Sequence, residues 1–191
     1  MSDVRLTSRR LRLRSWRDSD RAPFAELNAD PAVCEFLAGT LTREQSDVLV
    51  DRFRALEAEH GFTGWAVEET ATGTFVGYVG LVVPRFEPPF AHASEPCVEI
   101  GWRLARASWG QGYATEAARA CLEHAFGPLA LPEVVSFTVP ANARSRAVME
   151  RIGMTHDAGS DFDHPALPAG DRLSHHVLYR AVPARPEIMP T

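Results

Sequence analysis

The stretch that decides the fold is Glu99-Ile-Gly-Trp-Arg-Leu-Ala-Arg-Ala-Ser-Trp-Gly-Gln-Gly-Tyr-Ala-Thr-Glu116. At its start, apolar residues occupy every second position, which is the pattern of a β-strand. These residues are Val98, Ile100, Trp102 and Leu104. From Ala114 the apolar residues repeat every three or four positions, as on one helix face, until Gly127-Pro128. The stretch therefore predicts a strand, a loop with Gly110 and Gly112, and a helix.

The two glycines lie where this helix begins. A helix start leaves backbone N–H groups unpaired and carries the positive end of the helix dipole, so it attracts phosphate. Glycine lets these N–H groups approach an anion without a Cβ in the way. No Gly-Lys-Ser/Thr follows, and Thr115 occupies the third glycine position of a dinucleotide fingerprint, so neither of those motifs is present. The loop predicts a phosphate-bearing ligand, with a plain strand-to-helix turn as the alternative.

The bulk composition is ordinary for a soluble globular protein. Its 191 residues suit one domain, residues 1–191, with a sizeable core. The net charge of -5 argues against general nucleic-acid binding. The apolar runs are too short to span a bilayer, and the first residues show no signal-peptide pattern. We expect a cytoplasmic protein with neither a nucleic-acid nor a membrane partner.

Neither the cysteines nor the histidines show the spacing of a metal site. Cys34, Cys97 and Cys121 form no C-x-x-C pair and are expected to be small buried apolar residues. The seven histidines form no H-x-x-x-H pattern, and His175 and His176 on a strand would point to opposite faces. The sequence predicts no metal.

The first third of the chain predicts a strand and two helices. Residues 9–16 alternate as a strand whose arginines, Arg14 included, lie on a solvated face. Asp18 is a candidate N-cap of a first helix, and a short helical turn follows Pro31. Thr42 and Gln45 form a capping box for a second helix that ends near Gly61. Its expected apolar face consists of Val48, Leu49, Phe53 and Leu56.

The remaining segments complete an α/β layout. They are a hairpin over residues 65–82 that turns at Thr72-Gly73, a proline-rich segment over 84–96, a strand over 134–139, a helix over 142–151 closed by Gly153, a polar loop over 160–170, a strand over 176–182 and a tail from residue 183. This order predicts a mostly antiparallel mixed sheet of about six or seven strands flanked by helices.

Three motifs resemble the GNAT acetyltransferase superfamily: Glu99-Ile-Gly-Trp, then Trp109-Gly-Gln-Gly-Tyr-Ala-Thr-Glu, then Asn142-x-x-Ser with Ile152-Gly-Met. The chain is most similar to the ribosomal-protein N-terminal acetyltransferase branch, over roughly residues 9–182. The resemblance implies the GNAT acyl-CoA N-acyltransferase fold, acetyl-CoA as co-substrate, a monomer or homodimer, and transfer of an acetyl group to a primary amine. The amine would belong to a peptide N-terminus or to a small molecule.

The resemblance also implies which residues bind acetyl-CoA. These are Trp102, Leu104, Trp109, Gly110, Gln111, Gly112, Tyr113, Ala114, Thr115, Asn142 and Ser145. In this family the two early helices border the acceptor site, so residues 36–40 could line it. We expect Phe36 itself in the core, because large aromatic side chains are usually buried. The proline-rich segment either borders the acceptor or is a mobile surface loop.

Glu99 is the candidate general base. An amine must lose a proton as it attacks a thioester, and a carboxylate partly removed from water has a raised proton affinity. The alternative is a structural ion pair with Arg103, two residues along the same strand face.

Ser145 is the candidate donor to the departing sulfur. In the resembled branch the asparagine binds the pantetheine arm and the serine lies near the thioester. Many relatives place a tyrosine acid seven residues after the asparagine, but this chain has Met149 there. Helix capping is the alternative role of Asn142.

The phosphate loop also departs from the superfamily pattern. The superfamily often has Gln or Arg three residues before the first glycine, where this chain has Ala107. Arg106 lies one residue away from that position, and its role is left open.

A fold can also carry a non-catalytic function. The alternative to an enzyme is therefore an acyl-CoA-binding sensor or interaction module on the same fold. The presence of both Glu99 and Ser145 favours the enzyme.

Overall fold

The computed structural model describes residues 3–90, 97–168 and 170–183. In this part of the chain the strands are β1 (Val4–Thr7), β2 (Leu11–Arg14), β3 (Gly64–Glu69), β4 (Phe75–Val82), β5 (Glu99–Leu104), β6 (Val134–Thr138), β7 (Thr155–His156), β8 (Phe162–Asp163) and β9 (His175–Ala181). The α-helices are α1 (Arg21–Ala29), α2 (Arg43–His60), α3 (Tyr113–Phe126) and α4 (Ala143–Arg151). Short 3-10 turns cover Asp18–Asp20, Arg106–Ser108 and Ala158–Ser160.

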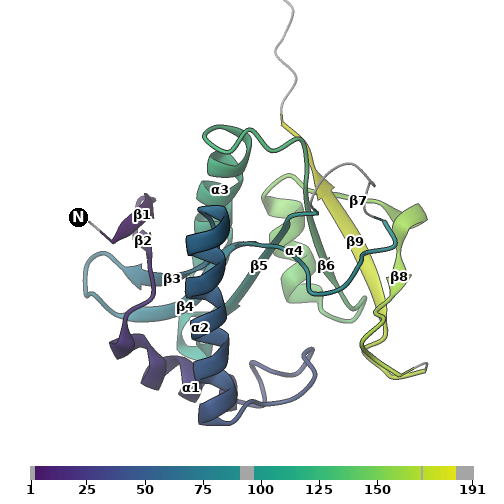
Figure 1. Cartoon of the computed structure of the whole chain (residues 1–191). Helices are drawn as coiled ribbons and strands as arrows, with labels where there is room; N and C mark the ends of the chain where they lie inside the picture. The colour runs from purple at the N-terminus through teal and green to yellow at the C-terminus, as the bar shows by residue number, and fades with distance from the viewer. Residues whose placement is uncertain (1–2, 91–96, 169, 184–191) are drawn as a thin grey trace, which may run out of the picture.

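One mixed sheet runs through the molecule in the order β1-β2-β3-β4-β5-β6-β9-β7, and β8 pairs with β9. Among the described strands only β5 and β6 are parallel neighbours, and a single residue pair joins them, Glu99 with Val135. The other neighbours are antiparallel. Beyond the Glu99–Val135 pair β5 and β6 diverge, as Figure 1 shows. The expected mostly antiparallel mixed sheet is confirmed.

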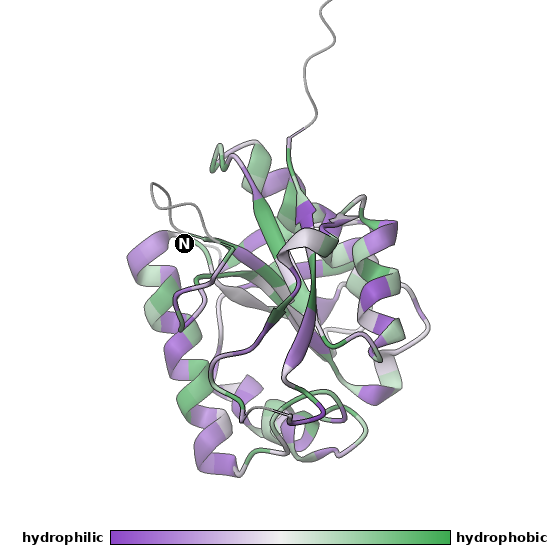
Figure 2. Ribbon diagram, turned by 90° about the vertical axis from the view of Figure 1, so that its right-hand side faces the viewer, coloured by the Kyte–Doolittle hydropathy of each residue, from purple (hydrophilic) through white to green (hydrophobic). Residues whose placement is uncertain are grey.

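Helices cover both faces of this sheet (Figure 2). On one face, buried residues of α3 and α4 such as Ala118 and Met149 join a core with Trp65 and Ile100. On the other face, α1 and α2 pack over β3 and β4 around Trp16. In Figure 1 the long α2 crosses in front of the sheet. A third cluster covers the other end of that second face, over β6 and β9, and contains Phe90, Val135, Phe162 and Leu178.

The capping box of α2 is confirmed, but its buried face is not the expected one. Gln45 N donates to Thr42 Oγ1 at 3.3 Å and Thr42 N donates to Gln45 Oε1 at 2.9 Å. Val48 is 63% exposed, so its placement on the inner face was wrong. The buried positions are Ser46, Val50 and Phe53. The hydropathy pattern does not indicate this face, because Ser46 is polar. Ser46 can be buried because its hydroxyl accepts a hydrogen bond from Asn28 Nδ2 at 2.9 Å.

The N-terminal segment differs from its expected form in four ways. The single strand is a hairpin, in which Ser8 N bonds to Leu11 O at 2.9 Å between β1 and β2. Asp18 makes no side-chain cap; it begins a 3-10 turn ahead of α1. The short helical turn expected after Pro31 is present, since Cys34 N donates to Asp30 O at 3.1 Å. Phe36, which follows this turn, is the third difference, because it is only half-buried and belongs to no core cluster of the described residues.

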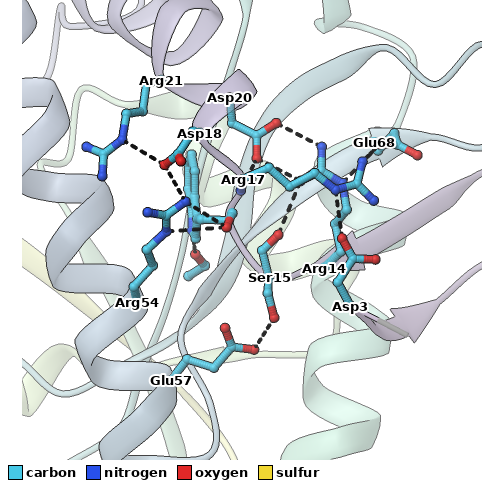
Figure 3. Close-up of polar contacts among 12 residues, drawn as sticks. Asp3, Arg14, Ser15, Arg17, Asp18, Asp20, Arg21, Arg54, Glu57 and Glu68 are labelled. Carbon is cyan, nitrogen blue, oxygen red and sulfur yellow. Dashed lines mark hydrogen bonds and ion pairs between the residues drawn. The ribbon is translucent and has the colours of Figure 1, made fainter. Parts of the chain in front are cut away.

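Arg14 is the fourth difference, because it is 2% exposed rather than solvated. It lies between Asp20 and Glu68 (Figure 3). Two N–H groups of its guanidinium reach Asp20 at 2.7 and 2.8 Å, and its Nε donates to Glu68 at 2.9 Å. The alternation of charged and apolar residues predicts only which face of a strand a side chain lies on, so it could not indicate that Asp20 and Glu68 pair with Arg14.

The C-terminal third agrees with the prediction except for its shortest strands. Gly153 closes α4 in the left-handed region at φ +87°, as expected. The loop expected over 160–170 contains β8, and β7 follows Gly153; two-residue strands are too short for a periodic pattern. Residues 84–90 of the proline-rich segment pack through Phe86 and Phe90 onto β6 and β9. Residues 91–96 of that segment, and residues 184–191 of the expected tail, lie outside the described residues.

Candidate active site

The divergence of β5 and β6 leaves one edge of β5 without a partner strand. Val135 N donates to Val98 O at 2.9 Å, so the main-chain groups of Val98 face β6. Main-chain groups alternate along a strand, so those of Trp102 and Leu104 face the same side, where no strand pairs with them. The Leu104 carbonyl accepts from Trp109 Nε1 at 3.0 Å. Trp102 therefore offers a free main-chain edge to an extended ligand.

The loop after β5 presents a row of unpaired main-chain amides. Gly110 and Gly112 are both left-handed, at φ +74° and +78°, which favours glycine at these two positions. The first hydrogen bond of α3 runs from Glu116 N to Gly112 O at 3.0 Å. Within the described chain no main-chain oxygen accepts from the amides that precede it, namely Gly110, Gln111, Gly112, Tyr113, Ala114 and Thr115. This is the donor array that a phosphate group requires.

The start of α3 is held rigidly by the N-terminal hairpin. Glu116 accepts from Ser8 Oγ at 2.8 Å and from Arg10 N at 2.7 Å. The Arg10 guanidinium lies 4.7 Å from the centre of the Tyr113 ring. The Tyr113 hydroxyl donates to Glu69, which raises the pKa of Tyr113. Its side chain is thus occupied, and Tyr113 can offer only its main-chain N–H to a coenzyme.

At the start of α4, Asn142 caps the helix and holds Ser145. Its Oδ1 accepts from Ser145 N at 3.2 Å, and its Nδ2 donates to Thr138 Oγ1 at 3.0 Å and to Ser145 Oγ at 3.1 Å. The capping role of Asn142 is confirmed. Because the Ser145 hydroxyl accepts from Asn142, its own proton remains available to another acceptor. Met149, at the position of the tyrosine acid in many relatives, is 1% exposed in the core.

Arg144 connects three segments near the glycine loop at residues 110–112. Its guanidinium lies 4.2 Å from the centre of the Trp109 ring and pairs with Glu35 at 3.0 Å. Gln111 and Arg106 are exposed, and Gln111 Nε2 donates to Ala107 O at 3.1 Å. The side chain of Arg106 makes no hydrogen bond or ion pair with the described residues, so no role for it emerges.

Glu99 is a half-buried carboxyl on the sheet face that α2 partly covers. The ion pair expected with Arg103 does not form; Arg103 instead donates to Asn28 Oδ1. In the part of the chain that the structure describes, no donor bonds to the Glu99 carboxyl. Burial raises the pKa of Glu99 to about 8, and the nearby Arg52 charge opposes this rise only in part. A carboxyl with this pKa can exchange a proton near neutral pH.

The open space beside Glu99 lies over Gly101. Among the described residues, an added Cβ at Gly101 would have a single neighbouring atom within 4 Å, Glu99 Oε1 at 3.9 Å. On the adjacent strand, Tyr78 and Val82 are in register with Arg103 and Glu99 and therefore share this face. Glycine at position 101 thus leaves room for a small group next to the carboxyl.

Tyr78 and Arg52 are candidate functional residues that the sequence analysis missed. Burial raises the pKa of Tyr78, and the charges of Arg103, Glu99 and Arg52 act on its hydroxyl. Arg52 extends from α2 to the end of β4, where its Nη2 donates to Val83 O at 3.3 Å. The register of β4 against β5 could have indicated Tyr78, but it depends on a long connection that the sequence does not resolve.

A cavity of about 440 Å³ lies between the segment before α2 and the segment before β9. Its walls come from two ranges, 31–40 and 167–173. Leu37, Ala38, Gly39 and Thr40 line this cavity, whereas Phe36 does not. Arg172 Nη2 donates to Glu35 O at 3.0 Å and so ties the two walls together.

A family model described as an acetyltransferase (GNAT) domain matches residues 10–155. The match spans most of the chain, so this protein belongs to the GNAT acetyltransferase family. Among the described residues, no helix is long and apolar enough to cross a membrane, and no group of His, Cys, Asp and Glu could hold a metal ion.

Individual relatives agree with this assignment. YkkB of Bacillus subtilis (strain 168), an uncharacterised protein, is 35% identical over 152 residues, which are 79% of this chain and 85% of YkkB. A protein of Aspergillus fumigatus named FsC-acetyl coenzyme A-N(2)-transacetylase is 36% identical over 135 residues, 69% of this chain and 56% of that protein.

A solved structure shares the fold. It is RimL, a ribosomal L7/L12 alpha-N-protein acetyltransferase in complex with coenzyme A, with a TM-score of 0.72 at 17% identity over 94% of this chain and 97% of RimL. The family and its named relatives together show an N-acetyltransferase that uses acetyl-CoA. The expected fold and enzyme class are confirmed, and the non-catalytic alternative is set aside.

Proposed function

We propose that this enzyme transfers an acetyl group to a primary amine by direct attack in a ternary complex, with Glu99 as the general base. The observation that carries the proposal is the Glu99 carboxyl itself. It is half-buried, makes no hydrogen bond to the described residues, and lies where β5 and β6 diverge, beside the open space over Gly101. A purely structural carboxyl in this position would be expected to have a partner.

The coenzyme is proposed to lie in the opening between β5 and β6. The unpaired amides from Gly110 to Thr115 would bind its pyrophosphate, with Trp109 and Gln111 flanking that loop. The free main-chain edge of Trp102 would pair with the extended pantetheine arm. The side-chain amide of Asn142 already donates both of its N–H groups, so Asn142 would contact the arm through the second lone pair of its Oδ1.

The chemistry follows from what amine acetylation requires. Acetyl-CoA supplies the activated acyl group. The deprotonated Glu99 accepts the proton that the amine must lose, directly or through a water molecule. Departure of the sulfur develops negative charge, and the free proton of the Ser145 hydroxyl is available to stabilise it. Tyr113 is unsuited to this second role because Glu69 already accepts its proton.

The acceptor is proposed to be the amine of a peptide N-terminus or of a small molecule. The names of two similar proteins support both options, since one is an alpha-N-protein acetyltransferase and the other an N(2)-transacetylase. The cavity between residues 31–40 and 167–173 would receive the part of the acceptor that does not react.

The test is a screen of peptides and small amines with acetyl-CoA, in which release of the free thiol is measured. Turnover that depends on the added amine is the expected result. Thiol release at the same rate with and without every amine would contradict the proposal, because the enzyme would then only hydrolyse acetyl-CoA. Mass spectrometry of the product identifies the acetylated nitrogen.

A further inference from the structure

The acceptor side of the sheet carries an arginine without a carboxylate partner. Arg52 is half-buried on α2, and its guanidinium donates a hydrogen bond to the Val83 carbonyl, an acceptor that carries no charge. No carboxylate among the described residues forms an ion pair with it. Buried charges are normally paired, as Arg14 is in the same molecule. The exception at Arg52 therefore requires a reason.

The position of Arg52 supplies that reason. Val83 follows Val82, which is in register with Glu99, so the guanidinium lies beside the proposed base. Its charge acts on Glu99 and on the Tyr78 hydroxyl. The neighbouring Arg85 adds a like charge rather than a compensating one. Positive charge has thus been gathered beside Glu99 without an ion-pair partner from the described chain.

Glu99 does not fill the role of that partner. Its carboxyl lies beyond ion-pair distance of Arg52, and a base that exchanges protons is neutral for part of the reaction cycle. A guanidinium uses one N–H for the Val83 carbonyl and keeps four donors for another group. A carboxylate matches the fork of these donors with two parallel hydrogen bonds.

We propose that the acceptor is a small primary amine that carries its own carboxylate, and that Arg52 binds this carboxylate while the amine lies beside Glu99. Free amino acids are the simplest members of this class. The inference rests on the proposed function and narrows it, because a peptide N-terminus has converted the neighbouring carboxylate into an amide.

The experiment compares amino acids with their own amides as acceptors. Each pair differs only in the carboxylate, and thiol release gives kcat and KM for both members. The variants are Arg52→Gln, Arg52→Lys and, as a control on the same helix, Arg43→Gln, whose side chain is exposed and pairs with Asp47. Thermal unfolding of each variant establishes that it is folded.

We expect the wild-type enzyme to prefer the acid of each pair. Arg52→Gln should lower kcat/KM for the acids about 10- to 100-fold more than for the amides, and this difference should lie mostly in KM. Arg52→Lys should recover part of the loss, because it restores the charge but not the fork. Arg43→Gln should behave as the wild type does.

Binding provides a readout without turnover. N-acetyl amino acids, the proposed products, should bind to the enzyme loaded with coenzyme A in calorimetry, and Arg52→Gln should weaken this binding by the same factor. N-acetyl amino amides should bind weakly to both proteins. If Arg52→Gln does not fold, the Arg52→Lys variant gives the same comparison with a smaller change.

Other outcomes overturn one proposal or the other. Equal use of acids and amides by the wild type, or an equal loss for both in Arg52→Gln, would show that Arg52 only supports β4. A preference for peptides over free amino acids would exclude the small-molecule class. Both results leave amine acetylation intact, whereas thiol release that no amine stimulates would remove the proposed function itself.

Discussion

Two charged regions of this protein are built in opposite ways. The Arg14 guanidinium is almost fully buried and forms ion pairs with Asp20 and Glu68, so the charges in this region are paired with one another (Figure 3). Around Glu99 and Arg52 the charges are also removed from water, but neither group has an ion-pair partner among the described residues. Both regions lie on the same sheet, only a few strands apart.

The difference separates charges that hold the fold from charges that serve a ligand. In the Arg14 region, donors match acceptors, so the network fixes how β2, β3 and the turn before α1 fit together. In the Glu99 region, desolvation remains uncompensated, and this lack of compensation raises the pKa of the carboxyl to about 8. The comparison predicts that mutations in the first region affect stability, whereas mutations in the second affect catalysis.

The largest effect is expected from Glu99→Gln. This change removes the proton acceptor and keeps the shape, so turnover should fall by about 10²- to 10⁴-fold. The Kd of acetyl-CoA should hardly change, and the free energy of unfolding should not fall, because glutamine avoids the cost of ionising a buried carboxyl. Steady-state kinetics with an accepted amine, calorimetry and chemical denaturation measure the three quantities. Activity close to wild type at every pH would assign Glu99 a structural role and erase the contrast with the Arg14 region.

The next effect is expected on stability, from Arg14→Met. The change leaves Asp20 buried without its cation and takes from Glu68 one of its arginine partners, so the free energy of unfolding should fall by about 3–5 kcal/mol. Arg12→Met is the matched control on the same strand. Arg12 is largely exposed and lies 3.7 Å from Glu68, so it should cost less than about 1 kcal/mol. If urea unfolding gives the same loss of unfolding free energy for Arg14→Met and Arg12→Met, the burial of Arg14 does not add to the stability that its ion pairs provide.

The sequence predicted the second of these regions better than the first. Glu99 was found because its neighbours form a motif within one continuous stretch, which includes the strand, the glycine loop and the helix start. Arg14 was placed in solvent because its partners lie in other elements, and local alternation cannot indicate them. Arg52 and Tyr78 were missed for the same reason, since only the pairing of β4 with β5 and the packing of α2 bring them to Glu99.

The pH dependence of stability offers a more direct measure of the Glu99 environment. The ordinary pKa of a glutamate is 4.5, and in the folded protein that of Glu99 is about 8. Between these values the folded state binds more protons than the unfolded state, so this group's contribution is fully present below pH 4.5 and is lost as the pH rises to about 8.

The wild type should therefore lose stability relative to Glu99→Gln by up to about 1.4 kcal/mol per pH unit within this window. Urea unfolding of both proteins from pH 5 to 9 gives the difference, in which the effects of all other groups cancel. A difference that does not change with pH would mean that Glu99 titrates at its ordinary value, like a carboxylate in water. The open region would then be no more desolvated than the surface.

The smallest effect is expected from Ser145→Ala, and it tests how far the open region extends. The Ser145 hydroxyl accepts a hydrogen bond from Asn142, which fixes its position and leaves its proton free. If this proton stabilises the departing sulfur, the interaction exists only as charge develops, so kcat should fall about tenfold while the Kd of acetyl-CoA stays constant. Thr138→Val, which removes the other side-chain partner of Asn142, controls for a disturbed cap. A fall in kcat of the same size in Thr138→Val would assign the effect to the cap, and a wild-type kcat in Ser145→Ala would leave the sulfur to a water molecule.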